Sequence, residues 1–301
     1  MRPTRRTFVT GALAAPFVTA LPVRRVEARP LGSGTLITVS DGFLTLPRSF
    51  VFEPMPQDAL PQVLDGYDLG EQLTPACNLT LYRDDTHTVL FDAGAGSDFM
   101  PTAGKLQDNL AAAGLSPADI THVVFTHAHP DHIWGTLDDF GDPLFADATH
   151  LIGRAERDYW SDPATVDTIG AERQTFAVGA RNRLDALEDR IDVFDDGDEI
   201  LPGIAAVATY GHTPGHMSFE VRNGGNAVLV IGDAIGNHHV AFRRPEWPSG
   251  SDQDMDLAAE TRLRLFDRIT ADDLLIAGFH LPDGGLGRVD RDGDGYRFVQ
   301  S

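Results

Sequence analysis

One short segment constrains this chain more than any other, because it places three histidines and an aspartate within six residues: His127-Ala128-His129-Pro130-Asp131-His132. The residues just before it are β-branched and apolar, which predicts a buried strand that ends where the segment begins. Side chains alternate along a strand, so His127 and His129 point the same way. Pro130 ends the strand, and Asp131 and His132 can then face a second metal position. The spacing predicts a metal site rather than a polar loop with fortuitous histidines.

Composition narrows the class of protein. The chain has 301 residues, enough for one large domain or two small ones. Its apolar share of 42% and charged share of 23% are ordinary for a soluble globular protein. The formal net charge of −21 would repel a phosphate backbone, so we expect no nucleic-acid partner.

The first 28 residues predict a twin-arginine export signal. A paired-arginine segment, Thr4-Arg5-Arg6-Thr7-Phe8-Val9, precedes an apolar run over residues 11–21 that is too short to span a bilayer. Cleavage after Ala28 would release a single domain over residues 29–301. This predicts a periplasmic or secreted protein without a membrane anchor after signal removal. The alternative is a basic N-terminus with a chance apolar helix.

Cys77 is the only cysteine, so neither an intramolecular disulfide nor a cluster of thiolate ligands can form. It lies in an alternating, strand-like run, which favours a small buried apolar role over a nucleophilic one. We therefore expect metal ligands to be histidines and carboxylates.

Periodicity predicts a layered α/β architecture with two sheets inside and helices outside. The expected strands cover residues 34–40, 78–82, 86–91, 121–126, 149–152, 191–194, 204–209, 218–221, 227–231 and 274–278. The expected helices cover residues 103–113, 154–160, 171–190 and 257–269. Residues 47–75 are rich in proline and are expected to be irregular, either as a lid over the active site or as a surface loop.

Three later segments place further metal donors after predicted strands. The first, Gly211-His212-Thr213-Pro214-Gly215-His216, offers two histidines. Asp233 ends one buried strand and His280 follows the last one. Loops that follow neighbouring strands can converge on one point.

With these segments the chain resembles the metallo-β-lactamase-fold hydrolases, and the resemblance includes Leu90-Phe91-Asp92-Ala93-Gly94. It implies a four-layer αββα sandwich with two divalent metal ions. The implied ligand sets are His127, His129 and His216 for one metal and Asp131, His132 and His280 for the other, with Asp233 bridging. Zinc is the default metal, and manganese, cobalt or iron suit the same donors. His212 is the alternative to His216 within its loop.

The resemblance also implies a class of substrate. A bridging carboxylate at Asp233 points to a small neutral ester, lactone, thioester or phosphotriester rather than to a β-lactam. Residues 104–106 and 293–299 resemble the methyl parathion hydrolase branch.

A few other side chains are candidates for the surroundings of the metals. Asp92 is expected to orient a metal-binding imidazole. Trp134, Trp160 and His238 are candidate pocket residues; core packing is the alternative for the tryptophans, and a solvated loop is the alternative for His238. Trp134 stands where the family commonly has glycine.

The implied mechanism uses a metal-bridging hydroxide, which Asp131 orients and from which it can accept a proton. Two alternative functions remain for this chain, namely an iron-dependent oxidoreductase on the same scaffold and a metal-holding binding protein without turnover. A homodimer is a further expectation for the assembly.

Overall fold

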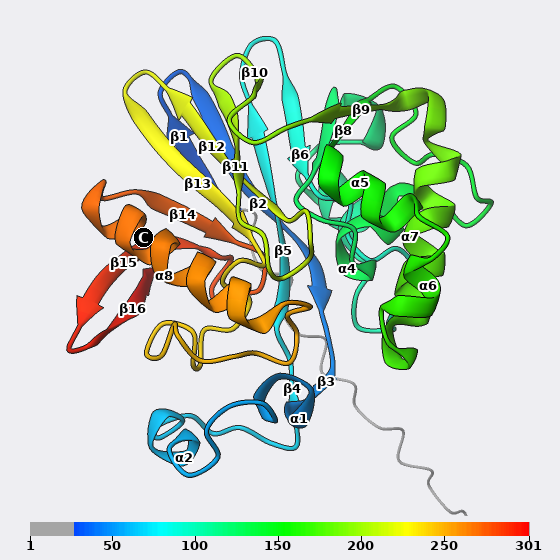
Figure 1. The fold of residues 1–301 in the computed structure, drawn as a ribbon. Coiled ribbons are helices and arrows are strands. Elements are labelled where there is room, and N and C mark those ends of the chain that lie inside the picture. Colours follow the sequence, from blue (N-terminus) through cyan, green and yellow to red (C-terminus); the bar gives the residue numbers. More distant parts are fainter. Residues whose placement is uncertain (1–26, 301) are drawn as a thin grey trace, which may run out of the picture.

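The computed structural model describes residues 27–300. Two seven-stranded sheets face each other, and helices cover their outer faces (Figure 1). Nearly all of the predicted export signal lies outside the described residues. Among the residues described, no helix is both long and apolar enough to cross a membrane.

The first sheet has the order β1-β2-β5-β6-β7-β8-β9. Its strands are β1 (Glu27–Leu31), β2 (Gly34–Phe43), β5 (Ala76–Arg83), β6 (Thr88–Phe91), β7 (His122–Phe125), β8 (Thr149–Gly153) and β9 (Ile191–Phe194). From β6 to β9 the neighbouring strands are parallel. Parallel strands end at the same edge of a sheet, so the loops after β6 and β7 lie side by side.

The second sheet has the order β10-β11-β12-β13-β14-β15-β16. Its strands are β10 (Glu199–Leu201), β11 (Ile204–Ala208), β12 (Met217–Asn223), β13 (Asn226–Gly232), β14 (Leu275–Gly278), β15 (Leu286–Asp292) and β16 (Gly295–Gln300). Only β13 and β14 pair in parallel. The loops after these two strands therefore also emerge at a common edge.

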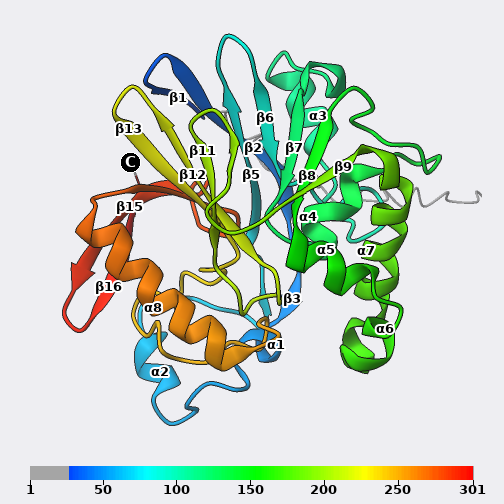
Figure 2. The ribbon, with the colours of Figure 1, turned by 45° about the horizontal axis from the view of Figure 1, so that its top comes forward.

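Three apolar clusters hold the four layers together. One joins residues of both sheets, such as Phe91 and Phe219, whose ring centroids are 5.4 Å apart. A second packs the first sheet against its helices, and a third packs α8 (Met255–Ala271) against the second sheet. Figure 2 shows α8 on the outer face of the second sheet and the helices that cover the first sheet on the opposite side of the molecule. The αββα sandwich predicted from the sequence is confirmed.

The remaining helices are shorter than α8. They are α1 (Arg48–Phe52), α2 (Leu60–Val63), α3 (Leu106–Ala112), α4 (Pro130–Ile133), α5 (Arg154–Ser161), α6 (Thr165–Thr168) and α7 (Gln174–Ala186). The predicted helix over residues 171–190 is wrong in its length, because 3-10 turns replace its first and last residues. The first turn ends at Arg173, whose side chain donates to the carbonyl oxygens of Gly250 and Ser251.

Residues 44–75 are more regular than the sequence suggested. They contain α1, α2 and a small two-stranded antiparallel sheet of β3 (Leu46–Pro47) and β4 (Gln72–Leu73). Their apolar side chains form a cluster of their own, which also includes Val240. This packing supplies the order that the proline-rich sequence did not indicate.

The sequence also missed the edge strands β1, β10 and β16, and β15, which pairs with β16. Strand β1 begins at Glu27 and pairs with β2 from that residue onward. The predicted cleavage after Ala28 would thus fall within a strand and leave Arg29–Leu31 paired with β2.

Candidate metal centre and pocket

Loops from both sheets bring the candidate donors together. The donor segments follow the carboxyl ends of strands, with His127 after β7, His212 after β11, Asp233 after β13 and His280 after β14, and Asp92, which contacts His132, follows β6 in the same way. All of these side chains are buried. The metal-site segment itself turns from β7 into α4 at Pro130, as the sequence predicted.

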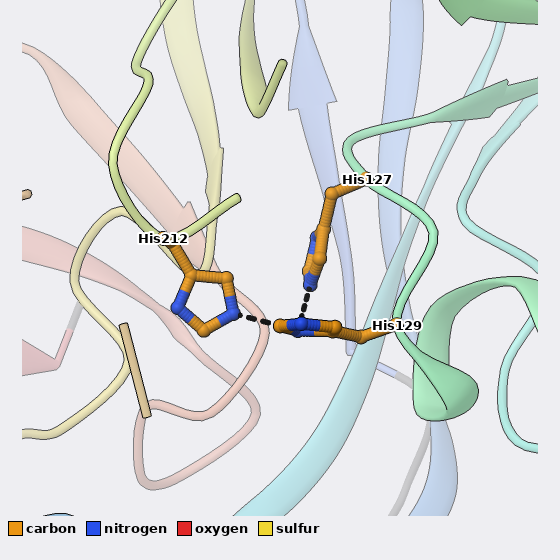
Figure 3. Close-up of side chains that lie close together, drawn as sticks. All are labelled: His127, His129 and His212. Carbon is orange, nitrogen blue, oxygen red and sulfur yellow. Dashed lines mark hydrogen bonds between the residues drawn. The ribbon is translucent and has the colours of Figure 1, made fainter. Parts of the chain in front are cut away.

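The first donor group consists of three histidines (Figure 3). Nε2 of His127 lies 3.1 Å from Nδ1 of His129, which lies 2.9 Å from Nε2 of His212. Burial and the neighbouring histidines lower the pKa of His127 well below its ordinary value, and burial and His212 do the same for His129. Neutral imidazoles have a lone pair to offer a metal, so this group is suited to bind one.

The structure does not bring His216 into this group. Its Nδ1 lies 2.8 Å from Oγ1 of Thr209, and its Nε2 accepts the backbone N–H of Asp233 at 3.0 Å. Both ring nitrogens are therefore occupied within the protein. His216 directly precedes β12 and closes the β11–β12 hairpin through backbone hydrogen bonding with Thr209. The structure thus places His212, the alternative within this loop, in the first donor group and His216 outside it.

The second donor group mixes carboxylates and imidazoles. Nε2 of His280 lies 3.2 Å from Oδ2 of Asp131 and 3.2 Å from Oδ2 of Asp233. Nε2 of His132 lies 3.5 Å from Oδ2 of Asp131 and 3.4 Å from Oδ1 of Asp233. Asp233 also faces the first group, since its Oδ2 lies 3.4 Å from Nε2 of His212. This carboxylate thus stands between the two groups.

The second group favours a positive charge. Burial opposes protonation of His132, but the facing carboxylates of Asp131, Asp92 and Asp233 raise its pKa well above the ordinary value. Burial likewise opposes protonation of His280, yet the same kind of attraction, first from Asp233, raises its pKa to about 10. These carboxylates therefore favour a positive charge between them, which a proton or a metal cation can supply.

Three buried atoms in this region have no hydrogen-bond partner in the described protein: Oδ2 of Asp131, Nε2 of His132 and Oδ1 of Asp233. Leaving buried polar atoms unpaired costs about 1–3 kcal/mol each. All three can donate an electron pair, and imidazole and carboxylate suit zinc and related divalent cations. The residues present therefore fit a pair of divalent metals.

The single thiol lies closer to this group than the sequence suggested. The donor atoms of Cys77, Asp131 and His280 lie within 4.8 Å of one another. Burial raises the pKa of the Cys77 thiol well above its ordinary value, and the nearby carboxylates act in the same direction. Its fully buried position in β5 matches the predicted apolar role.

Other side chains fix the orientation of the donors. Asp92 lies where the sequence analysis expected it, with Oδ2 2.8 Å from Nδ1 of His132. Asp92 has a φ of 67°, and its carboxylate accepts the backbone N–H and the hydroxyl of Thr126. These hydrogen bonds stabilise a backbone conformation that is otherwise uncommon for aspartate.

Two positioning contacts escaped the sequence analysis. Nδ1 of His212 lies 3.0 Å from Oδ1 of Asp252, and Asp252 in turn pairs with buried Arg262 on α8 at 3.2 Å. Nδ1 of His280 donates to the carbonyl oxygen of Ala76 at 2.7 Å. Asp252 follows a long loop without periodicity, so the sequence offered no signal for it.

Glu156 is a third missed residue, and it joins two donor loops. Its buried carboxylate accepts the backbone N–H of Ala128 and of Gly215, both at 2.9 Å. It also accepts the hydroxyl of Thr213 at 2.8 Å and Nε1 of Trp160 at 2.6 Å. A carboxylate on a helical face reads as solvent-exposed in a sequence, which explains why it was missed.

A cavity of about 290 Å³ opens onto the donors. His129, Asp131, His212, Asp233 and His280 lie in its wall. Most of the remaining wall is apolar, and residues 44–75 contribute much of it: Leu44, Leu46, Pro47, Phe50, Val51, Leu73 and Pro75. Of the two sequence-based alternatives for residues 47–75, the structure favours a cover over the site.

Of the three candidate pocket residues, one lines the cavity and two do not. His238 lines the cavity, as expected. Trp134 does not; it packs against Phe99, with the Arg183 guanidinium 4.8 Å from its ring centroid. Trp160 is also outside the cavity wall, because its indole is fully buried and bound to Glu156. The packing alternative therefore holds for both tryptophans.

The family model described as the metallo-beta-lactamase superfamily matches residues 74–280. The chain belongs to the metallo-beta-lactamase superfamily. The match extends from the start of β5 to His280 and thus includes every donor described above.

The curated proteins that are similar to this chain include lactonases. The N-acyl homoserine lactonase AttM of Agrobacterium fabrum is 35% identical over 127 residues, which are 41% of this chain and 44% of the lactonase. The chain therefore spans less than half the length of this relative. An uncharacterised protein of Mycobacterium tuberculosis is 29% identical over 217 residues, covering 69% of this chain and 88% of that protein.

Two solved structures match nearly the whole chain. AidC, a dizinc quorum-quenching lactonase, superposes with a TM-score of 0.86 at 23% identity, over 92% of this chain and 97% of AidC. The hydrolase AbOPH superposes with a TM-score of 0.85 at 28% identity over the same shares. The metallo-β-lactamase fold expected from the sequence is thereby confirmed.

Proposed function

We propose that this chain is a two-metal hydrolase that opens lactones and related esters of small neutral acyl compounds. One observation carries the proposal: two groups of buried metal donors, spanned by Asp233, form the floor of an otherwise apolar pocket. A concave apolar site with a few convergent polar groups is the usual form of a small-molecule active site.

The metal ligands would be distributed between the two groups. His127, His129 and His212 would hold one ion, while Asp131, His132 and His280 would hold the other, with Asp233 shared. When bound, two divalent cations polarise a carbonyl group and lower the pKa of a water molecule toward neutrality. Zinc suits this mixture of imidazole and carboxylate best, and AidC is described as dizinc.

The remaining chemistry belongs to the protein. Asp131 carries an oxygen, Oδ2, that no N–H or O–H group of the described protein satisfies, and the residue lines the pocket. We assign to this atom the role of accepting the proton of the attacking water and returning it to the departing alkoxide. The apolar wall excludes bulk water and holds the acyl chain.

The substrate class follows from the pocket and from the relatives. A pocket with an apolar wall, in a chain of net charge −21, favours a neutral ligand over an anionic one. AttM and AidC are described as lactonases, and the AidC structure contains N-hexanoyl-L-homoserine as product. An acyl homoserine lactone is therefore the first substrate to test.

The test combines metal removal with a substrate panel. Chelation should abolish hydrolysis of N-hexanoyl homoserine lactone, and addition of zinc should restore it. Phosphotriesters belong in the same panel, because the resemblance to the methyl parathion hydrolase branch implies them. Lactone hydrolysis that survives complete metal removal would overturn the proposal.

Export through the twin-arginine route, cleavage after Ala28 and a homodimeric assembly are separate proposals. Replacing Arg5 and Arg6 with lysine should retain the protein inside the producing cell, and N-terminal sequencing of the exported form gives the cleavage site. Light scattering of the purified protein tests the dimer. An exported double-lysine variant would contradict the twin-arginine route.

A further inference from the structure

Two residues that line the pocket each carry a buried N–H group without a partner in the described protein. These groups are Nε of Arg173 and Nδ2 of Asn237. An unpaired buried donor is unfavourable, and native proteins rarely keep one without a reason. Both residues lie outside the metal donor groups, so the metals do not account for them.

The position of Arg173 is fixed by contacts on its other side. Its Nη2 donates to the carbonyl oxygens of Gly250 at 2.7 Å and Ser251 at 3.3 Å. Its guanidinium carbon lies 5.8 Å from the centroid of the Phe50 ring. These contacts hold the planar group in place, which leaves Nε available as a preorganised donor.

The amide of Asn237 is fixed in a similar way. Its Oδ1 accepts the backbone N–H of His239 at 2.9 Å and lies 3.3 Å from Nδ1 of the same residue. The bond from the backbone N–H distinguishes the oxygen of the amide from its nitrogen. Nδ2 is therefore the unsatisfied end.

In the described protein no acceptor makes a hydrogen bond with either of these two donors. The carboxylates in the pocket wall, Asp131 and Asp233, belong to the metal donors. Burial lowers the pKa of His238 to about 4 and that of His239 to about 3, so at neutral pH both rings are neutral and add no positive charge to the pocket wall. The complement of this surface is a ligand that carries an acceptor oxygen on an apolar body.

We infer that Arg173 and Asn237 are specificity residues that bind a second carbonyl oxygen of the substrate, such as an amide carbonyl, at a distance from the bond that is cleaved. This inference rests on the proposed function for the identity of the scissile group. These two residues would favour the binding of acylamino lactones and similar compounds over that of simple alkyl lactones.

Equilibrium binding tests this selection without turnover. The probes are two γ-lactams that resist hydrolysis, one with a hexanoylamino group on the α-carbon and one with an alkyl chain of equal length there. Calorimetry on the zinc-loaded protein should show roughly ten-fold or greater preference for the acylamino lactam, as expected for one or two recovered hydrogen bonds. Arg173→Met and Asn237→Leu should each reduce the preference, and the double variant should remove it.

A matched control is Arg181→Met, since Arg181 lies on α7 outside the pocket wall and pairs with Asp185 at the surface. It should keep the preference of the parent. Equal affinity of the parent for both lactams, no measurable binding of either, or an unchanged preference in the double variant would overturn the inference. If the preference is found but neither parent lactone is hydrolysed, the proposed function fails and the inference stands.

Discussion

His212 and His216 are four residues apart in one loop, and the backbone gives them different roles. His216 ends a hairpin pairing, and both of its ring nitrogens bond within the second sheet. His212 lies before the Pro214–Gly215 turn and reaches across to His129, on the loop of the first sheet. A sequence shows two equivalent imidazoles here, because the hydrogen bonds that separate them come from Thr209 and Asp233.

The two histidines should respond differently to replacement. His212→Ala should reduce the metal content of the purified protein from about two ions to about one, because it removes a donor of the first group. His216→Ala should retain both ions and lower the free energy of unfolding by about 1–3 kcal/mol, since it leaves buried polar partners unpaired. Elemental analysis after gel filtration and denaturant unfolding distinguish the two. The reverse pattern would restore the sequence-based choice.

Asp233 should be the least dispensable donor, because its two oxygens face both groups. Asp233→Ala should weaken the retention of both metals and reduce turnover severely. Metal content and kcat measured on the same preparation provide the readout. Full activity with two bound metals in this variant would contradict the bridging role.

At the scale of elements, periodicity predicted most of the strands and the longer helices. It did not predict most of the strands at the sheet edges or the order in residues 44–75, which cover the site. Residues 44–75 have no helical or alternating pattern, and their order comes from tertiary contacts with residues such as Val240 and Trp247. The hairpin of β15 and β16 exposes many charged side chains, so its sequence looks polar throughout. Its buried face is formed by Val289 and Tyr296. A single sequence contains no direct record of such contacts.

Helix α5 links the two donor loops through Glu156, which accepts four hydrogen bonds. Glu156→Gln should disturb this linkage, because an amide nitrogen would face donors that need an acceptor. We expect a loss of about 1–3 kcal/mol in the free energy of unfolding and weaker zinc binding in the first group. Zinc titration against a chelating indicator measures the latter. The exposed Glu188→Gln should behave like the parent, and equal zinc affinity in both variants would contradict the linkage.

At the scale of the molecule, buried neutral histidines make the fold sensitive to acid. Burial lowers the pKa of His150 to about 4, below the ordinary 6.5. The unfolded chain therefore binds a proton that the folded chain does not, and stability is lost as pH falls from about 6.5 toward 4. His238 and His239 act in the same direction.

His150→Gln should flatten this dependence, since glutamine does not titrate. Between pH 6.5 and pH 4.5 the parent should lose about 1–3 kcal/mol more of its unfolding free energy than the variant. Denaturant unfolding at several pH values measures the difference. Parallel curves for parent and variant would show that His150 does not contribute.

The central claim is that loops from two sheets form one centre for two metals, with His212 rather than His216 among the ligands. Anomalous X-ray diffraction from a zinc-loaded crystal tests it most directly. We predict two anomalous peaks, one among His127, His129 and His212 and one among Asp131, His132 and His280, with Asp233 between them. A single peak, or a peak coordinated by His216, would contradict the account.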